Sequence, residues 1–317
     1  MRTKAATIAF ALATLLSHGP SEAAPLAETQ EPIKLAQFNV TDADFITGVF
    51  GGVLEKAGYN VEYVKVDVTA LFTALELGDV PMSPAIWGSL QDLIDKTLAT
   101  GKVEKKGTIG VKVREGWWYP NYVADVCPGL PDWTALTKPD CIKALSTPET
   151  GGKIRYIGTP ADWAPFDVER IKSLGLAVEI VPSGSPAAMV ATLQGAVQRK
   201  QPIIGFGFVP HWFYGAGQGS FVNFPKYDSG CRTDPAWGIN PKEIGDCDLA
   251  EGEIYKLVNI AAEAKTPAAL RILDAYKIST DDVAKGIHQV EQEGLTVDQA
   301  AAKWLEANEA TWSAWLK

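Results

Sequence analysis

The chain has 317 residues, of which 46% are hydrophobic, and it carries a formal net charge of -9 at pH 7. This length and composition allow a sizeable buried core and about two domains. No basic patch or stripe stands out along the sequence, so nucleic acid is not an expected partner.

The first 23 residues have the pattern of a cleaved secretory signal. A basic start, MRTK, precedes an apolar run over residues 5–16, and Ser21 and Ala23 occupy the positions that a signal peptidase prefers. The apolar run is too short to span a bilayer, and no later run approaches about 20 apolar residues. Cleavage after Ala23 removes two basic residues and one acidic residue, which moves the net charge from -9 to -10. We expect a mature protein that is exported to the periplasm.

All four cysteines lie in the mature part of the chain, where an even count in an exported protein favours disulfides. Neighbour pairing, Cys127 with Cys141 and Cys231 with Cys247, would close two loops and contribute on the order of 3 kcal/mol each. The sequence leaves the connectivity open. No C-x-x-C spacing exists, and only His211 and His288 remain after removal of the signal, so we expect no zinc site. We also expect no other metal and no cofactor.

Strands and helices alternate along the first half of the mature chain. A polar loop at residues 39–42 starts the first helix, and Gly58 stops it. The pattern predicts strands over residues 33–38, 61–66 and 82–86, and helices to about residue 56, over 69–77 and from after Trp87 to about 98.

The second half continues the alternation with strands over residues 108–113, 153–158, 177–181 and 203–206. Ser185 caps a helix that begins at Pro186. We expect residues 115–122 to be a crossover and residues 213–248 a long irregular return. From residue 249 onward the chain is expected to be helical, with helices opening at residues 266, 280 and 296. The fold class is therefore α/β, with parallel sheets covered by helices on both faces.

Large aromatic residues follow three of the predicted strands. Trp87 and Trp163 each lie between the end of a strand and the start of a helix, and Phe208 follows a third strand. Ligands of open α/β sheets bind beyond the carboxyl ends of the strands, although aromatic residues there can also be packing residues. A quaternary ammonium group has no N–H, so aromatic faces must select it by cation–π attraction. We expect such a cage, completed by Tyr122 or Trp118.

Several ordered motifs resemble those of substrate-binding proteins of ABC importers of the glycine betaine, proline betaine and choline group. The motifs are LGDVPMSPAIW, GWWYPNYV, GTPADW, PIIGFGFVPHW and AAAKWLEANEATWSAWL. This resemblance covers nearly the whole mature chain. It implies two α/β lobes joined by a hinge, with the first lobe discontinuous in sequence, that close over a ligand in an aromatic cage. It also implies an inner-membrane permease as partner, a monomer and no enzymatic activity.

The resemblance assigns ligand contacts to Trp87, Trp163 and Tyr122. Phe208 departs from the family, which commonly has Trp at this place, whereas Pro210 and Trp212 match it. The loop at residues 39–42 is similar to the stretch that meets the polar end of the ligand. The full set of expected ligand-binding residues is Trp87, Trp163, Phe208, Tyr122, Trp118, Trp117, Trp212, Asn39, Asp42 and His211.

The expected domain organisation places residues 24–119 and 218–317 in the first lobe and residues 120–217 in the second. The ligand within the methylated ammonium class stays open between glycine betaine, choline, proline betaine, carnitine, dimethylsulfoniopropionate and trimethylamine N-oxide.

A secreted carbohydrate-binding protein or glycoside hydrolase is the alternative, because tryptophans also stack on sugar rings. A hydrolase needs two carboxyl groups about 5 to 10 Å apart. The candidates are Asp42, Asp44, Glu115, Asp162 and Asp167. A serine hydrolase is disfavoured because the sequence has no G-x-S-x-G motif.

Overall fold

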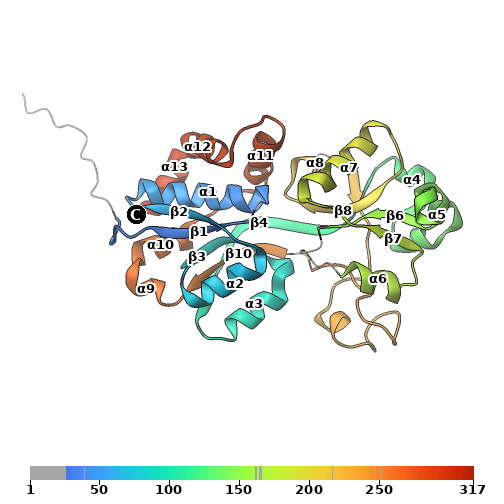
Figure 1. Cartoon of the computed structure of the whole chain (residues 1–317), viewed down its shortest axis with the longest axis horizontal. Helices are drawn as coiled ribbons and strands as arrows, with labels where there is room; N and C mark the ends of the chain where they lie inside the picture. Colours follow the sequence, from blue (N-terminus) through green and yellow to red (C-terminus); the bar gives the residue numbers. More distant parts are fainter. Residues whose placement is uncertain (1–25, 39, 161–162, 164–165, 216, 251) are drawn as a thin grey trace, which may run out of the picture.

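The computed structural model describes residues 26–38, 40–160, 163, 166–215, 217–250 and 252–317. The predicted signal peptide, Asn39 and Asp162 lie outside these residues. Figure 1 shows two α/β lobes side by side, joined by the long strand β4 (Val103–Pro120), which runs from one lobe into the other. None of the helices within the described ranges is long and apolar enough to cross a membrane.

The first lobe contains a parallel pair of strands and three antiparallel strands. β1 (Ile33–Gln37) pairs with β2 (Val61–Lys65), while β10 (Gly252–Asn259) lies between β3 (Met82–Trp87) and the first part of β4. The helices of this lobe are α1 (Thr41–Lys56), α2 (Val68–Leu77), α3 (Gln91–Leu98), α9 (Ala262–Lys265), α10 (Pro267–Ala275), α11 (Thr280–Glu291), α12 (Val297–Ala307) and α13 (Glu309–Trp312).

The second lobe extends the same sheet. β8 (Ile204–Val209) pairs antiparallel with the second part of β4, and β6 (Ile154–Ile157) lies parallel between β8 and β7 (Val178–Val181). The remaining elements are β5 (Pro128–Pro131), β9 (Gly219–Phe221), α4 (Val123–Val126), α5 (Pro139–Leu145), α6 (Asp167–Ser173), α7 (Pro186–Gln198) and α8 (Trp212–Gly215).

The predicted helix starts are confirmed where a capping group marks them. The Ser185 hydroxyl accepts a hydrogen bond from the Ala188 N–H, and Pro186 is the first residue of α7. Thr296 and Gln299 form the reciprocal bonds of a capping box at the start of α12. α1 is buried on almost all sides, since α11 and α12 cover the side that faces away from β1 and β3.

Three expectations for the elements were wrong. Residues 115–120 are not a crossover but the second part of β4, where both Trp117 and Trp118 are fully buried. A strand that is buried on both faces does not show the alternation of apolar and polar residues that identifies most strands. The chain beyond residue 249 first forms β10 and only then becomes helical. The large sheet is mixed rather than parallel, because β10 and β4 run antiparallel to their neighbours.

Each lobe has a hydrophobic core of its own. The second core includes Trp118, Val222, Phe224 and Leu249, so the irregular segment before β10 packs on the second lobe. Both disulfides follow the neighbour pairing, Cys127 with Cys141 and Cys231 with Cys247. The closing tryptophans pack on their own lobe, as expected, and Trp304 stacks on Trp315 with ring centroids 6.2 Å apart.

Candidate ligand-binding site

A cavity of about 370 Å³ lies between the two lobes. The first lobe lines it with the start of α1, the end of β3 and parts of α2 and α3. The second lobe contributes the end of β8, the segment between β6 and α6, and the loop that contains Cys231. The cavity therefore lies beyond strand ends, where ligands of α/β sheets are expected.

The three aromatic residues that follow predicted strands meet in this cavity. The Phe208 ring lies edge-on to both tryptophans, with centroid distances of 5.8 Å to Trp87 and 6.0 Å to Trp163. Trp87 comes from the first lobe, while Trp163 and Phe208 come from the second. Three further rings line the cavity: Phe38, Phe166 and Phe206.

Asp42 is the expected polar residue that reaches the cavity. It lies in the first turn of α1, is only 2% exposed, and its Oδ2 accepts a hydrogen bond of 2.7 Å from the Trp87 indole N–H. This bond fixes the orientation of the indole ring. Burial raises the pKa of Asp42 to about 7, and the nearby Asp44 carboxylate adds to the shift.

Glu115 is a second carboxyl group on the cavity wall. Burial and the charge of the nearby Asp42 together raise its pKa to about 7, although the hydrogen bond from Ser89 lowers it. Both carboxyl groups thus change protonation near neutral pH. Each can donate a hydrogen bond when it is protonated and accept one when it is ionised.

Arg232 brings a positive charge to the same cavity. Its guanidinium carbon lies 4.0 Å from the centroid of the Phe166 ring, and the charges of Asp92 and Glu115 act on it. Arg232 belongs to the short helical turn η5 (Ser229–Arg232) within the irregular segment of the second lobe. The cavity wall therefore combines aromatic faces with charged groups of both signs.

Three expected site residues lie away from the cavity. Trp117 stacks on Tyr156 at 4.2 Å inside the second core, and its indole N–H donates to Asp167. Trp118 is fully buried in the same core. The Tyr122 hydroxyl donates to the carbonyl of Gln201 at 2.9 Å, in the loop that follows α7. None of the three lines the cavity.

His211 and Trp212 form a contact between the lobes instead of a cavity wall. The Trp212 indole N–H donates to Glu291 Oε2 at 2.8 Å, and His211 Nε2 lies 3.2 Å from the same oxygen. His211 Nδ1 accepts from the Phe213 N–H, which leaves the proton on Nε2, facing Glu291. Burial raises the pKa of Glu291, but the nearby His211 and the hydrogen bonds from Trp212 and Thr41 lower it more, so the net shift is downward.

The sequence reasoning missed several cavity residues. Phe206 lies two positions before Phe208 on β8, so the strand period of two could have placed both on one face. Phe38 follows directly on β1, which is the same signal that identified Trp87. No sequence signal pointed to Arg232, because its position depends on the path of an irregular loop.

The model of the substrate-binding domain of ABC-type glycine betaine transport systems matches residues 31–307. The trimethylamine N-oxide-binding protein of Pelagibacter ubique is 33% identical over 299 residues, which cover 92% of each chain. Two solved structures share the fold. Lactococcal OpuAC in complex with glycine betaine has a TM-score of 0.67 at 18% identity, covering 90% of this chain and 99% of that one. A choline-binding protein in complex with choline has a TM-score of 0.70 at 17% identity, covering 90% and 91%.

The family match spans most of the chain, and the relative is similar over nearly its whole length. The fold agrees with both, since the solved neighbours are two-lobed binding proteins with open sheets. This chain therefore belongs to the substrate-binding proteins of betaine- and choline-type ABC transporters, which are solute-binding proteins and not enzymes.

Proposed function

We propose that this protein captures a small methylated amine in an aromatic cage and delivers it to an inner-membrane permease. The observation that carries the proposal is the meeting of Trp87, Trp163 and Phe208, from three separate strand ends, on one cavity between the lobes. Each contact between an aromatic face and a methylated cationic centre contributes roughly 0.5 to 2 kcal/mol. Three rings together supply useful affinity.

Trimethylamine N-oxide is the ligand that we place first, followed by glycine betaine. The N-oxide has a cationic centre for the rings and an oxygen that accepts hydrogen bonds. Asp42 and Glu115 can supply such a bond, since their raised pKa values keep a protonated fraction near neutral pH. The similarity to the Pelagibacter ubique protein supports the same order.

The cavity does not favour a sugar. A carbohydrate presents a hydroxyl group on most ring carbons, and each hydroxyl that is buried without a partner is costly. Six aromatic rings line this cavity, together with aliphatic side chains such as Leu71 and Ile86. Two of the proposed acidic residues are engaged elsewhere: Asp44 accepts from the Phe38 N–H, and Asp167 accepts from Trp117, Tyr156 and Arg170.

We also propose that the lobes open and close about two adjacent strands. β4 leaves the first lobe near residue 115, and the chain returns into β10 opposite it, where Gly252 pairs with Val113. Packing supports boundaries near residues 115 and 251, because Val222 and Leu249 belong to the second core. The protein is proposed to act as an exported, periplasmic monomer.

Calorimetric titration of the mature protein tests the function. We expect saturable one-to-one binding of trimethylamine N-oxide at micromolar or lower concentration. Glycine betaine and choline serve as comparison ligands of the same class. Heat changes that do not saturate with any of the three would contradict the proposal.

A further inference from the structure

We propose that Arg232 determines the charge class of the ligand. The loop closed by Cys231 and Cys247 brings the guanidinium group of Arg232 to the cavity. There the group selects methylated amines that bear an anionic or N-oxide oxygen over cations of similar size that lack one. This inference rests on the proposed function and concerns the same cavity. Arg232 lies in a segment that contains none of the motifs on which the family resemblance rests.

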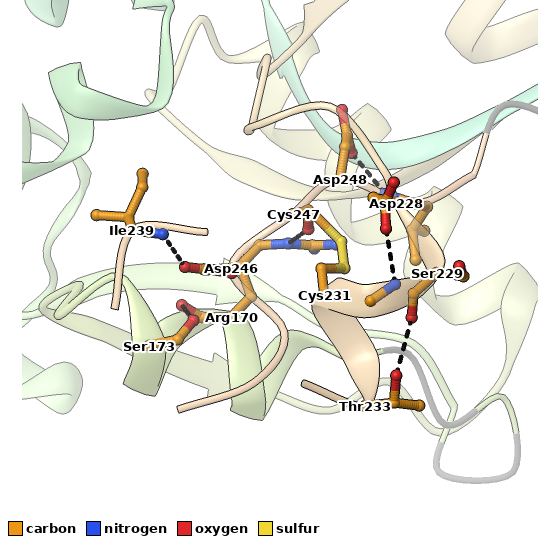
Figure 2. Close-up of a disulfide and its surroundings, with 12 residues drawn as sticks. Arg170, Ser173, Asp228, Ser229, Cys231, Thr233, Ile239, Asp246, Cys247 and Asp248 are labelled. Atoms are coloured by element: carbon orange, nitrogen blue, oxygen red, sulfur yellow. Dashed lines mark hydrogen bonds between the residues drawn. A yellow bond between two sulfur atoms is a disulfide. The ribbon is translucent and has the colours of Figure 1, made fainter. Parts of the chain in front are cut away.

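The loop that contains Arg232 is anchored at several points. The disulfide joins Cys231, the neighbour of Arg232, to Cys247 (Figure 2). The Gly245 N–H donates to the Cys231 carbonyl at 2.6 Å, and the Cys247 carbonyl accepts from Arg170 Nε at 3.0 Å. Arg170 is 1% exposed and pairs with Asp167 at 3.0 Å within the second core. These contacts fix the backbone on both sides of the disulfide, so Arg232 is held on a rigid support.

A second set of contacts closes the interior of this loop. Asp246 is 1% exposed, and its Oδ2 accepts from the N–H groups of Ile239 and Asn240 at 2.5 and 3.0 Å. The Asn240 side chain in turn donates to the Ser173 carbonyl, at the end of α6. The segment lacks regular secondary structure, yet its buried polar groups are paired with one another and with α6.

The guanidinium group has donors available for a ligand. It lies over the Phe166 ring at 4.0 Å and near the Tyr227 ring at 5.5 Å. Among the described residues, the Arg232 side chain makes neither a hydrogen bond nor an ion pair. Stacking leaves the five N–H groups in the guanidinium plane free, and this planar fork suits a carboxylate or another oxygen acceptor.

The charges around the cavity support the same selection. Glu115 and Asp92 attract Arg232 but lie beyond ion-pair distance, so its positive charge is not cancelled by a direct partner. A bare cation in the cage would be repelled by this charge. A zwitterion or N-oxide can place its cationic centre among the rings and its oxygen toward Arg232. The arrangement therefore favours a dipolar ligand.

Two pairs of ligands and one variant test the inference. Trimethylamine N-oxide and glycine betaine bear the oxygen, whereas tetramethylammonium and choline are cations of comparable size. We expect the native protein to bind the first pair at least about tenfold more tightly than the second. Arg232→Gln should weaken binding of the first pair about tenfold or more and leave the second pair unchanged or tighter. Arg232→Lys, which keeps the charge, should retain most of the preference.

Calorimetry on the native protein decides the matter even if Arg232→Gln does not fold. Equal affinity of the native protein for the ligands with an anionic or N-oxide oxygen and for the two ligands without one overturns the inference and leaves the proposed function intact. The inference is also overturned if the ratio of affinities between the first and the second ligand pair is the same in the native protein and in Arg232→Gln. If none of the four ligands binds, the proposed function fails first, and the two failures are distinguishable.

Discussion

The indole rings of Trp87 and Trp163 face one cavity from opposite lobes, and the Phe208 ring lies between them. Trp87 is oriented by its hydrogen bond to Asp42, whereas Trp163 packs edge-on against Phe206 at 5.9 Å. Phenylalanine is a weaker cation–π face than tryptophan, so the two tryptophans should carry most of the binding energy.

Replacing either cage tryptophan should weaken the binding of the ligand. We expect Trp87→Ala and Trp163→Ala each to lose more than about 1 kcal/mol of binding free energy, measured by calorimetry with trimethylamine N-oxide. Trp312→Ala is the matched control, because Trp312 packs on the first core and does not line the cavity. Unchanged affinity in both cage variants would rule out the cage.

Asp42 should make the stability of the ligand-free protein depend on pH. Burial raises its pKa to about 7, so the folded state retains a proton that the unfolded chain releases at lower pH. The contribution of Asp42 to the free energy of unfolding is therefore most favourable below the ordinary pKa of an aspartate and falls as pH rises toward about 7. The effect amounts to about 4 kcal/mol at most.

Asp42→Asn keeps an oxygen that can accept the Trp87 N–H bond but removes the titration. Asp167 and Asp248, whose pKa values burial also raises, contribute the same trend to both proteins. Glu115 contributes less in the variant, because the charge of Asp42 no longer raises its pKa, and this adds to the expected difference. Urea unfolding between about pH 4 and pH 8 should thus show a steeper loss of stability in the native protein than in the variant. Parallel pH profiles would show that Asp42 does not titrate in this range.

At the scale of elements, the end of α11 meets the start of α8 across the gap between the lobes. Glu291 of the first lobe accepts a hydrogen bond from Trp212 of the second, and His211 Nε2 lies 3.2 Å from the same carboxylate oxygen. The Trp212 ring also lies edge-on to His288 of α11, with centroids 5.8 Å apart. His211 contacts the Phe208 ring at 5.0 Å, so this contact between the lobes lies directly behind the cage.

Removing the Glu291 carboxylate should favour opening of the lobes. We expect Glu291→Gln to raise the dissociation rate of the ligand several-fold, because hydrogen bonds to a charged group contribute about 1.5 to 3 kcal/mol and the variant keeps only neutral ones. Stopped-flow tryptophan fluorescence measures the rate. Glu293→Gln is the control, since Glu293 pairs with His288 and Lys303 of the first lobe and not, among the residues that the structure describes, with the second. Equal dissociation rates in the native protein and both variants would contradict a role in closure.

Local sequence patterns predicted those elements whose signals are local. Ser185 with Pro186 marked the start of α7, and alternation of apolar and polar residues marked β6. The second part of β4 was missed because Gly116 and Pro120 suggested an irregular segment and burial on both faces hid the strand period. β10 was missed because its GEIYKLVN sequence includes Lys256, which is buried and donates to the carbonyls of Leu273 and Asp274 at the end of α10.

For the cavity, too, the residues that were predicted correctly have a local sequence signal, and Arg232, which was missed, has none. Trp87, Trp163 and Phe208 were predicted to meet because each follows a strand, and the cavity contains all three. The roles expected for Trp117 and Trp118 depended on the crossover that the structure replaces with a strand, and both are core residues. Arg232 could not be predicted, because a disulfide and contacts distant in sequence determine where its loop lies.

For the whole molecule, the division into two lobes places the proposed ligand cavity where movement of the lobes would control it. Each lobe has its own core, and β4 continues through both (Figure 1). The cavity is built from both lobes, so separation of the lobes would divide the proposed cage between Trp87 on one side and Trp163 with Phe208 on the other. Ligand binding and closure are then one process, the usual behaviour of two-domain receptors.

A crystal structure of the mature protein with trimethylamine N-oxide tests the central claim most directly. We predict the methylated nitrogen within about 6 Å of the ring centroids of Trp87, Trp163 and Phe208, with the oxygen directed toward Arg232 or a carboxyl group of the cavity. A ligand bound outside the cavity between the lobes, or inside it with no aromatic face toward its methyl groups, would contradict the account.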